Sequence, residues 1–331
     1  MKYIRFHLYT LLLLFLLPME TQAQGCSDAG FCTMGALKPN QSGKRTQLVN
    51  LRSIEITHYF AYTNASLKNG KNPSAKDYFQ SIIVDANVGI GKKYSFQLKL
   101  PYNATYGILA NTSGIGDISY GLTRSIIENT KLQIGATIGG KIPTGSANLK
   151  FENRPLPMYY QPGLGTWDGI AGVGINFKNI LFATGIQHPF NANNNTFVWK
   201  PWNSTPDSAE ANHYLRTNNF MRGTDVMFRL EYNLRFANWN VHAGILNIYR
   251  INKDKFRNSK GVYEEIKYTN GLVSSLVVGG SYRFSTKSAI KIVAAWRINE
   301  RDAYAPEKEK FPNPDGLKRF FVNTISYEYK F

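Results

Sequence analysis

Apolar and polar residues alternate with a period of two along most of the chain, which is typical of β-strands whose two faces meet different surroundings. In the segment 226–236, every second residue is Val, Phe, Leu or Tyr, and the residues between them are mostly polar or charged. The segments 94–103 and 321–331 alternate in the same way. The pattern predicts strands with one apolar face and one mostly polar face.

The predicted strands number about twelve, an even number as single-chain bacterial barrels require. They are 48–62, 78–90, 94–106, 116–127, 131–143, 167–177, 179–190, 221–236, 239–251, 272–284, 288–298 and 319–331. Their connections are short at 91–93, 128–130, 178, 237–238 and 285–287, and long at 63–77, 107–115, 144–166, 191–220, 252–270 and 299–318. Short turns on one rim and long loops on the other match outer-membrane barrels. The sequence therefore predicts an all-β fold, a transmembrane antiparallel up-and-down β-barrel.

The charged face of these strands is expected to line the lumen, because a Lys or Arg facing hydrocarbon at mid-depth costs about 2–4 kcal/mol. The predicted lumen-lining residues are Glu55, Asp85, Lys99, Lys131, Lys141, Arg229, Glu231, Arg235, His242, Arg283, Lys291 and Arg297. Positive charges are the more frequent in this set. A barrel of this size lies between filled and open ones, so the charges either seal the interior through ion pairs or line a narrow, anion-leaning path.

The composition agrees with a membrane barrel. The mean hydropathy is only −0.30, since a barrel hides its apolar residues by alternation. Aromatic residues make up 14% of the chain, which suits interfacial girdles and would also suit a carbohydrate-binding β protein. The formal net charge is +17. Because an exported protein seldom meets nucleic acid, we expect contacts with anionic lipid headgroups or solutes and no nucleic-acid partner.

The first 23 residues have the layout of a cleaved secretory signal peptide, with Lys2 and Arg5 ahead of a short apolar run. The run 8–17 is too short to span a bilayer as a helix, which disfavours an uncleaved anchor. Lipidation of Cys26 is a weaker alternative, because the apolar run ends well upstream of this cysteine.

Residues 24–46 predict a periplasmic arm that can lie in the barrel as a plug, and residues 47–331 predict the barrel itself. Cys26 and Cys32 are the two cysteines of the chain. In an oxidising compartment they predict a local disulfide. Two thiols without a nearby His make half a zinc site at best, so we expect no metal.

Three glycine-rich segments follow one another in mid-chain: SGIGDISYGL at 113–122, KIPTGS at 141–146 and GLGTWDGIAGVGI at 163–175. Their order resembles outer-membrane transporter-like proteins of the phenol-degradation type, which are relatives of the long-chain fatty acid porins. The resemblance implies a barrel that transports a hydrophobic solute. The GCSDAGFC segment resembles the N-termini of Bacteroidetes-type barrels. In a purely structural reading, Asp117 and Asp168 bind nearby backbone amides or pair with lumen cations.

The last predicted strand ends on Phe331. It resembles the C-terminal signal of bacterial outer-membrane barrels that the barrel-assembly machinery reads, although Ser326 stands where many such signals have Gly. The resemblance implies that the protein resides in the outer membrane of a Gram-negative bacterium, with outer-membrane lipid and the assembly machinery as partners.

Enzymatic chemistry has little support in the sequence. An outer-membrane phospholipase needs a Ser activated by a His, and its paired His and Ser lie two residues apart. His58, His188, His213 and His242 all lack a Ser at that spacing. The segment 207–213 has Asp, Glu and His but lacks the spacing of a calcium loop, so it is expected to be a solvated loop. We expect no catalytic residue and no cofactor.

The predicted long loop 191–220 carries Trp199 and Trp202. These side chains either fold inward as a gate or lie at the headgroup level. The sequence as a whole predicts a channel or transporter for passive movement of a small solute, which the family resemblance implies to be hydrophobic. The alternatives are a closed-lumen barrel that presents its loops to a partner and, with less support, a lipid-modifying enzyme.

Overall fold

The computed structural model describes residues 49–64, 76–212, 214–266, 269–299 and 318–331. The predicted signal peptide, the predicted arm and both cysteines lie outside the described residues. Most of the predicted loops 63–77 and 299–318 also lie outside them.

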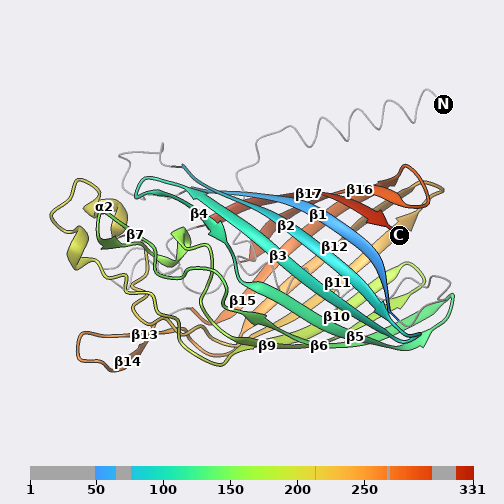
Figure 1. Ribbon diagram of the computed structural model, residues 1–331, viewed down its shortest axis with the longest axis horizontal. Coiled ribbons are helices and arrows are strands. Elements are labelled where there is room, and N and C mark those ends of the chain that lie inside the picture. Colours follow the sequence, from blue (N-terminus) through green and yellow to red (C-terminus); the bar gives the residue numbers. More distant parts are fainter. Residues whose placement is uncertain (1–48, 65–75, 213, 267–268, 300–317) are drawn as a thin grey trace.

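In the described part of the chain, twelve antiparallel strands form a closed barrel (Figure 1). They are β1 (Val49–Asn64), β2 (Lys76–Ile90), β3 (Tyr94–Tyr106), β5 (Ile118–Glu128), β6 (Leu132–Ile142), β9 (Asp168–Phe177), β10 (Ile180–Pro189), β11 (Asp225–Arg235), β12 (Trp239–Arg250), β15 (Gly271–Arg283), β16 (Ser288–Asn299) and β17 (Lys318–Lys330). Each barrel strand pairs with the next one along the chain, and β1 pairs with β17 to close the barrel. The predicted up-and-down architecture is confirmed.

The predicted strand positions are close to the observed ones, and β3 has the predicted bounds. One prediction was wrong, because 107–115 is not simply a loop. A short turn is followed there by β4 (Asn111–Ile115), which pairs with the extracellular half of β3. β5 then pairs with the other half of β3 after a break at Gly116 and Asp117.

The two faces of the barrel strands meet different surroundings, as the alternation predicts. Leu230 points outward and is 54% exposed, whereas the lumen-facing Glu231 beside it is 4% exposed. Exposed aromatic residues stand near both ends of the outer face: Tyr94, Trp239, Tyr327, Trp167, Phe190 and Tyr249. A closed barrel with such an apolar, aromatic-edged exterior is solvated by a bilayer. The protein is therefore an outer-membrane barrel of the Gram-negative type.

The long loops fold together into an extracellular cap at one end of the barrel (Figure 1). The cap contains β7 (Lys150–Phe151), β8 (Arg154–Pro155), η2 (Met158–Tyr160), η3 (Lys200–Trp202), α2 (Ser208–Ala211), β13 (Lys255–Arg257) and β14 (Tyr263–Glu265). Its core joins three loops through Leu109, Leu156, Tyr160, Phe197, Trp202 and Tyr214. Among the described residues, no helix has the length and apolar content needed to cross a membrane.

Candidate functional site

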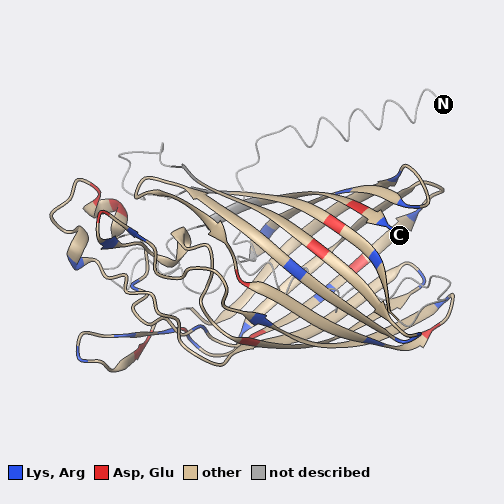
Figure 2. Ribbon diagram, in the orientation of Figure 1, with Lys and Arg blue, Asp and Glu red and all other residues tan. Residues whose placement is uncertain are grey.

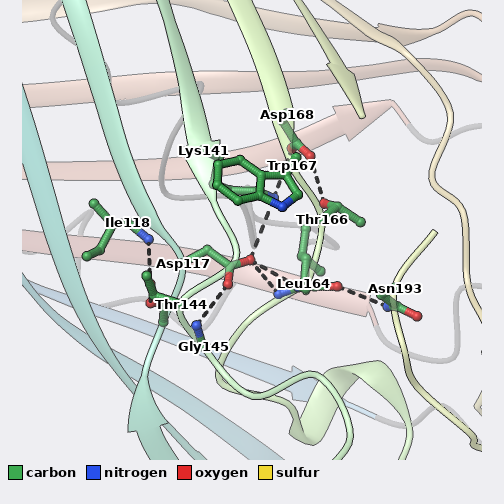
Figure 3. Close-up of polar contacts among 12 residues, drawn as sticks. Asp117, Ile118, Lys141, Thr144, Gly145, Leu164, Thr166, Trp167, Asp168 and Asn193 are labelled. Atoms are coloured by element: carbon green, nitrogen blue, oxygen red, sulfur yellow. Dashed lines mark hydrogen bonds and ion pairs between the residues drawn. The ribbon is translucent and has the colours of Figure 1, made fainter. Parts of the chain in front are cut away.

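The three glycine-rich segments of the sequence meet at one carboxylate, that of Asp117 (Figure 3). Its Oδ1 accepts a hydrogen bond from the backbone N–H of Gly145 at 3.1 Å. Its Oδ2 accepts from the N–H groups of Leu164 and Gly165 at 2.7 and 3.2 Å. Since Gly145 begins the loop 145–163 and Leu164 follows its end, Asp117 closes the base of this loop.

The base of the loop 145–163 is very narrow. A Cβ atom on Gly145 would lie 2.9 Å from the Cα of Gly163, closer than real side chains come, so only glycine permits this approach. The hydroxyl of Thr144 adds a further tie: it donates to the carbonyl of Gly116 at 2.8 Å and accepts from the N–H of Ile118 at 3.0 Å. The break between β4 and β5 is thus where the loop is anchored.

Lys141 on β6 links Asp117 at the base of the loop to Asp168 on β9. Its Nζ lies 2.9 Å from Oδ2 of Asp168 and 3.9 Å from Oδ2 of Asp117. Asp168 also accepts hydrogen bonds from the hydroxyl of Thr166 at 2.7 Å and from the amide of Gln187. The structure agrees with the structural reading of these residues, because Asp117 binds backbone amides and both carboxylates pair with the lumen-facing Lys141.

The loop 145–163 enters the mouth of the barrel at η2. The lumen-facing hydroxyl of Thr105 donates to the carbonyl of Tyr159 at 3.3 Å. Thr112 donates to the carbonyl of Tyr160 at 2.6 Å, and Asn103 donates to that of Pro162 at 2.6 Å. These bonds hold the loop against the inner wall formed by β3 and β4.

Two side chains of η2 reach different sides of the mouth. Tyr159 packs against a cluster on the inner faces of β1, β2 and β17, which consists of Tyr59, Ala61, Phe79 and Val322. Met158 packs against a second cluster, formed by Phe220, Phe256 and Ile266 of the cap. The η2 segment therefore crosses the mouth and narrows it.

Below this constriction, a row of charged side chains crosses the inner wall. In the strand register, the neighbours along this row are Glu328, Glu55, Asp85, Lys99, Ser119, Lys141 and Asp168. Figure 2 shows it as a diagonal line of red and blue segments over adjacent strands. Because the strands are staggered around a barrel, the row climbs from the periplasmic half of β17 to the extracellular end of β9.

The exposure of the charged side chains falls along this row. The side chains of Glu55, Glu328 and Asp85 are 15, 14 and 13% exposed. Those of Lys141 and Asp168 are 4 and 1% exposed. Along this row, the charges nearer the periplasm are therefore partly exposed, whereas those beside the cap are sealed.

The other predicted lumen residues fall into two groups. Arg229 and Glu231 form an ion pair on β11, with 2.6 Å between Nε and Oε1. His242 faces the lumen from β12, and Arg297 is buried on the lumen side of β16. Three residues are exposed near the periplasmic ends of their strands: Lys131, Arg235 and Arg283. Most of the predicted lumen charges therefore lie inside, as members of ion pairs.

The predicted gate residues Trp199 and Trp202 lie in the cap. Trp202 is 1% exposed, and its Nε1 donates to the carbonyl of Pro155 at 2.9 Å. The Nε1 of Trp199 donates to the carbonyl of Tyr214 at 2.9 Å. Both side chains pack with the cluster that contains Tyr160, so they contact the segment that crosses the mouth. A role for them in gating stays a prediction.

A second buried charge network holds the base of the other loops, and no periodic pattern in the sequence predicted it. Arg250 pairs with Asp225 at 2.8 Å and with Asp254 at 2.7 Å. Arg222 also pairs with Asp225. Burial lowers the pKa of the Arg222 guanidinium, while the neighbouring Asp225 raises it. The only cue in the sequence is that these charges stand where strands meet long loops.

Among the described residues, no group of three or more His, Cys, Asp or Glu side chains lies close enough together to bind a metal ion.

No protein-family model matches the chain. No curated protein matches it either.

Solved structures do match the chain. An outer membrane channel from Pseudomonas putida F1 aligns with a TM-score of 0.58 at 12% identity, covering 88% of this chain and 100% of that one. The toluene transporter TbuX from Ralstonia pickettii aligns with a TM-score of 0.44 at 10% identity, covering 93% and 97%. The translocator domain of the autotransporter NalP from Neisseria meningitidis aligns with 0.41 at 9% identity, covering 89% and 91%. The first alignment supports a shared barrel fold and nothing beyond it. The TM-scores of the other two are too low to support an inference.

Proposed function

We propose that this protein is an outer-membrane channel or transporter through which a small solute moves passively, inward or outward. One observation carries the proposal: charged side chains line the lumen, those nearer the periplasm partly exposed, and a single short segment, η2, crosses its outer mouth.

The outer gate in this proposal is formed by the predicted loops 144–166 and 191–220, which pack on each other. The loop 145–163 is joined to the wall at its narrow base and through a few hydrogen bonds to β3 and β4. Net hydrogen bonds of this kind contribute about 0.5–1.5 kcal/mol each. In this proposal the segment leaves the mouth when these hydrogen bonds and the packing of Tyr159 are broken, while the barrel strands keep their pairing. The predicted arm 24–46 would be the inner gate.

A partly hydrophobic solute is the finer part of the proposal. The inner faces of β12, β15 and β16 carry apolar side chains: Leu246, Ile248, Val273, Val277 and Val293. They stand on the side of the barrel away from Lys141 and Asp168. A place in the phenol-degradation type of transporter, of Bacteroidetes-like origin, belongs to the same proposal and is supported by the three motifs that meet at Asp117.

Export and assembly complete the proposal. Residues 1–23 would be removed as a signal peptide, Cys26 and Cys32 would form a disulfide, and the barrel-assembly machinery would read the strand that ends at Phe331. The outward-facing apolar belt supports outer-membrane lipid as the surrounding partner.

Single-channel recording in planar bilayers tests the function. The wild-type protein should show opening events, and the double variant Met158→Ala/Tyr159→Ala should show a larger conductance because η2 no longer fills the mouth. Tyr263→Ala, on an exposed hairpin of the cap, is the matched control and should conduct like the wild type. If neither the wild type nor the double variant opens, the barrel is closed and the alternative of a loop-presenting scaffold is favoured.

Two histidines in the described part of the chain, His58 and His188, give no support to a lipid-modifying enzyme. The ring of His188 lies 2.8 Å from the hydroxyl of Thr224 on the outer side of the barrel end. His58 is exposed on the outer face, near the side-chain amide of Gln80. Neither contact joins a His to a Ser nucleophile. Hydrolysis of a labelled phospholipid that disappears in His242→Ala would contradict this view.

A further inference from the structure

The strands that close the barrel carry charged side chains of both signs near the periplasmic end of the lumen. Glu55 on β1 faces Glu328 on β17, and Lys330 stands two residues farther along β17. Lys291 projects from the neighbouring strand, β16. We refer to Glu55, Lys291, Glu328 and Lys330 as the seam cluster.

The seam cluster is balanced in charge. The Nζ of Lys291 lies 2.7 Å from Oε2 of Glu55 and 3.1 Å from Oε2 of Glu328. The Nζ of Lys330 lies 3.9 Å from the same oxygen of Glu328. Two carboxylates and two ammonium groups therefore offset each other, so a single neutralising substitution leaves a net charge at this place in the lumen.

The seam cluster is also more exposed than the charged side chains farther along the row. The side chains of Lys330 and Lys291 are 37 and 24% exposed, compared with 4% for Lys141 beside the cap. Ions that enter from the periplasm therefore meet the seam cluster before the sealed pairs. Asp85 follows next to Glu55 in the register, so the cluster continues into the charged row.

Charges that line a narrow lumen act on every ion that passes. Interactions between charges remain effective over about 8 Å at physiological ionic strength, and rings of charged side chains set the ion selectivity of many pores. We propose, on the basis of the channel function above, that the seam cluster determines the ion selectivity of the pore. The solute class that follows is a small molecule with at least one ionised group.

A purely structural seam cluster would behave differently. If its ion pairs only joined β1 to β17, neutral substitutions would lower stability and leave the selectivity of the open pore unchanged. If it sets selectivity, removing a cation and removing the anions must move the selectivity in opposite directions. The direction of the change separates the two cases.

The experiment is the reversal potential of the purified full mature protein in a planar bilayer under a tenfold KCl gradient. Lys291→Met leaves two carboxylates against the single ammonium group of Lys330, so the ratio of K⁺ to Cl⁻ permeability should rise severalfold. Glu55→Gln/Glu328→Gln leaves two ammonium groups, so the ratio should fall. Lys330→Gln removes one cation but keeps the ion pairs of Lys291 with Glu55 and Glu328. This variant should fold even if Lys291→Met does not, and its ratio of K⁺ to Cl⁻ permeability should also rise.

The matched control is Lys92→Gln, which removes one positive charge from an exposed periplasmic turn outside the lumen and should leave the ratio unchanged. Wild-type ratios in all the folded seam-cluster variants would overturn the inference and leave the channel function standing. A wild-type protein that never opens would overturn the channel function, and this inference with it.

Discussion

Glu55 on β1 and Glu328 on β17 stand directly opposite each other at the seam where the first barrel strand pairs with the last. Two carboxylates opposite each other on one face of an antiparallel pair repel. Lys291 from β16 contacts both, at 2.7 and 3.1 Å. The ammonium group of Lys291 therefore offsets the repulsion between the two carboxylates. The pairing of β1 with β17 thus depends on a side chain from a third strand, β16.

Replacing Lys291 by Met should destabilise the barrel by about 1–3 kcal/mol, below the cost of breaking a fully buried pair because water screens the remaining charges in part. Urea unfolding in detergent micelles, followed by far-UV circular dichroism, measures this change. The triple variant Lys291→Met/Glu55→Gln/Glu328→Gln should recover most of the loss. A single variant as stable as the wild type would show that the facing carboxylates do not strain the seam.

Replacing Asp117 by Asn should release the loop 145–163. An amide offers one acceptor oxygen to the three N–H groups that the carboxylate now accepts, and it loses the charge that faces Lys141. We expect a local loss of about 1–3 kcal/mol and faster cleavage of this loop by an added protease in intact vesicles. Asp207→Asn, whose side chain does not cap α2, should be cleaved at the wild-type rate.

Replacing Gly244 by Ala should cost about 1–3 kcal/mol, as overpacking usually does. A Cβ atom there would lie 2.2 Å from the carbonyl oxygen of Leu230 and 2.6 Å from Cγ of Glu231. Gly280→Ala is the matched control, because the nearest atom to its Cβ is the carbonyl oxygen of Asn240 at 3.6 Å. Unfolding midpoints in the same detergent compare the two. Equal midpoints for the two variants would contradict the packing around Glu231.

Replacing Trp202 by Ala should loosen the cap and leave the barrel intact. The indole is almost fully buried and donates to Pro155, and the loss of a buried Trp costs about 3–5 kcal/mol. Hydrogen exchange in the cap should therefore speed up, with little change in the barrel strands. Trp167→Ala, with an indole that is 52% exposed, serves as control. Faster exchange throughout the barrel would show that the cap and the barrel unfold together.

The barrel strands were predictable because hydrocarbon on one face and the lumen on the other select opposite residue types at alternate positions. The same rule explains why β4 was missed. Its outward positions include Asn111 and Ser113, which are polar and exposed. Ile115 is the one apolar residue at the outward positions of β4, so the alternation that marks the other strands is lost.

The junction at Asp117 was predictable only in part. The sequence identified three glycine-rich segments and a structural reading of Asp117 and Asp168, but not that Gly145 and Leu164 bind one carboxylate. Such a meeting depends on how the barrel brings residues 117, 145 and 164 together, which no local pattern encodes. The position of η2 in the mouth was not predicted for the same reason. Tyr159 contacts Tyr59 and Phe79, which lie far from it in the sequence and come near it only in the closed barrel.

The contact of Gly145 with Gly163 gives the protein a site at which one loop can be exchanged as a unit. The two ends of the loop leave the wall side by side, so a segment of different length and sequence can start and finish at the same two points. Homologous barrels could then differ in what they admit while their strands stay the same. Grafting a foreign loop between these glycines would be the natural way to give this barrel a new selectivity.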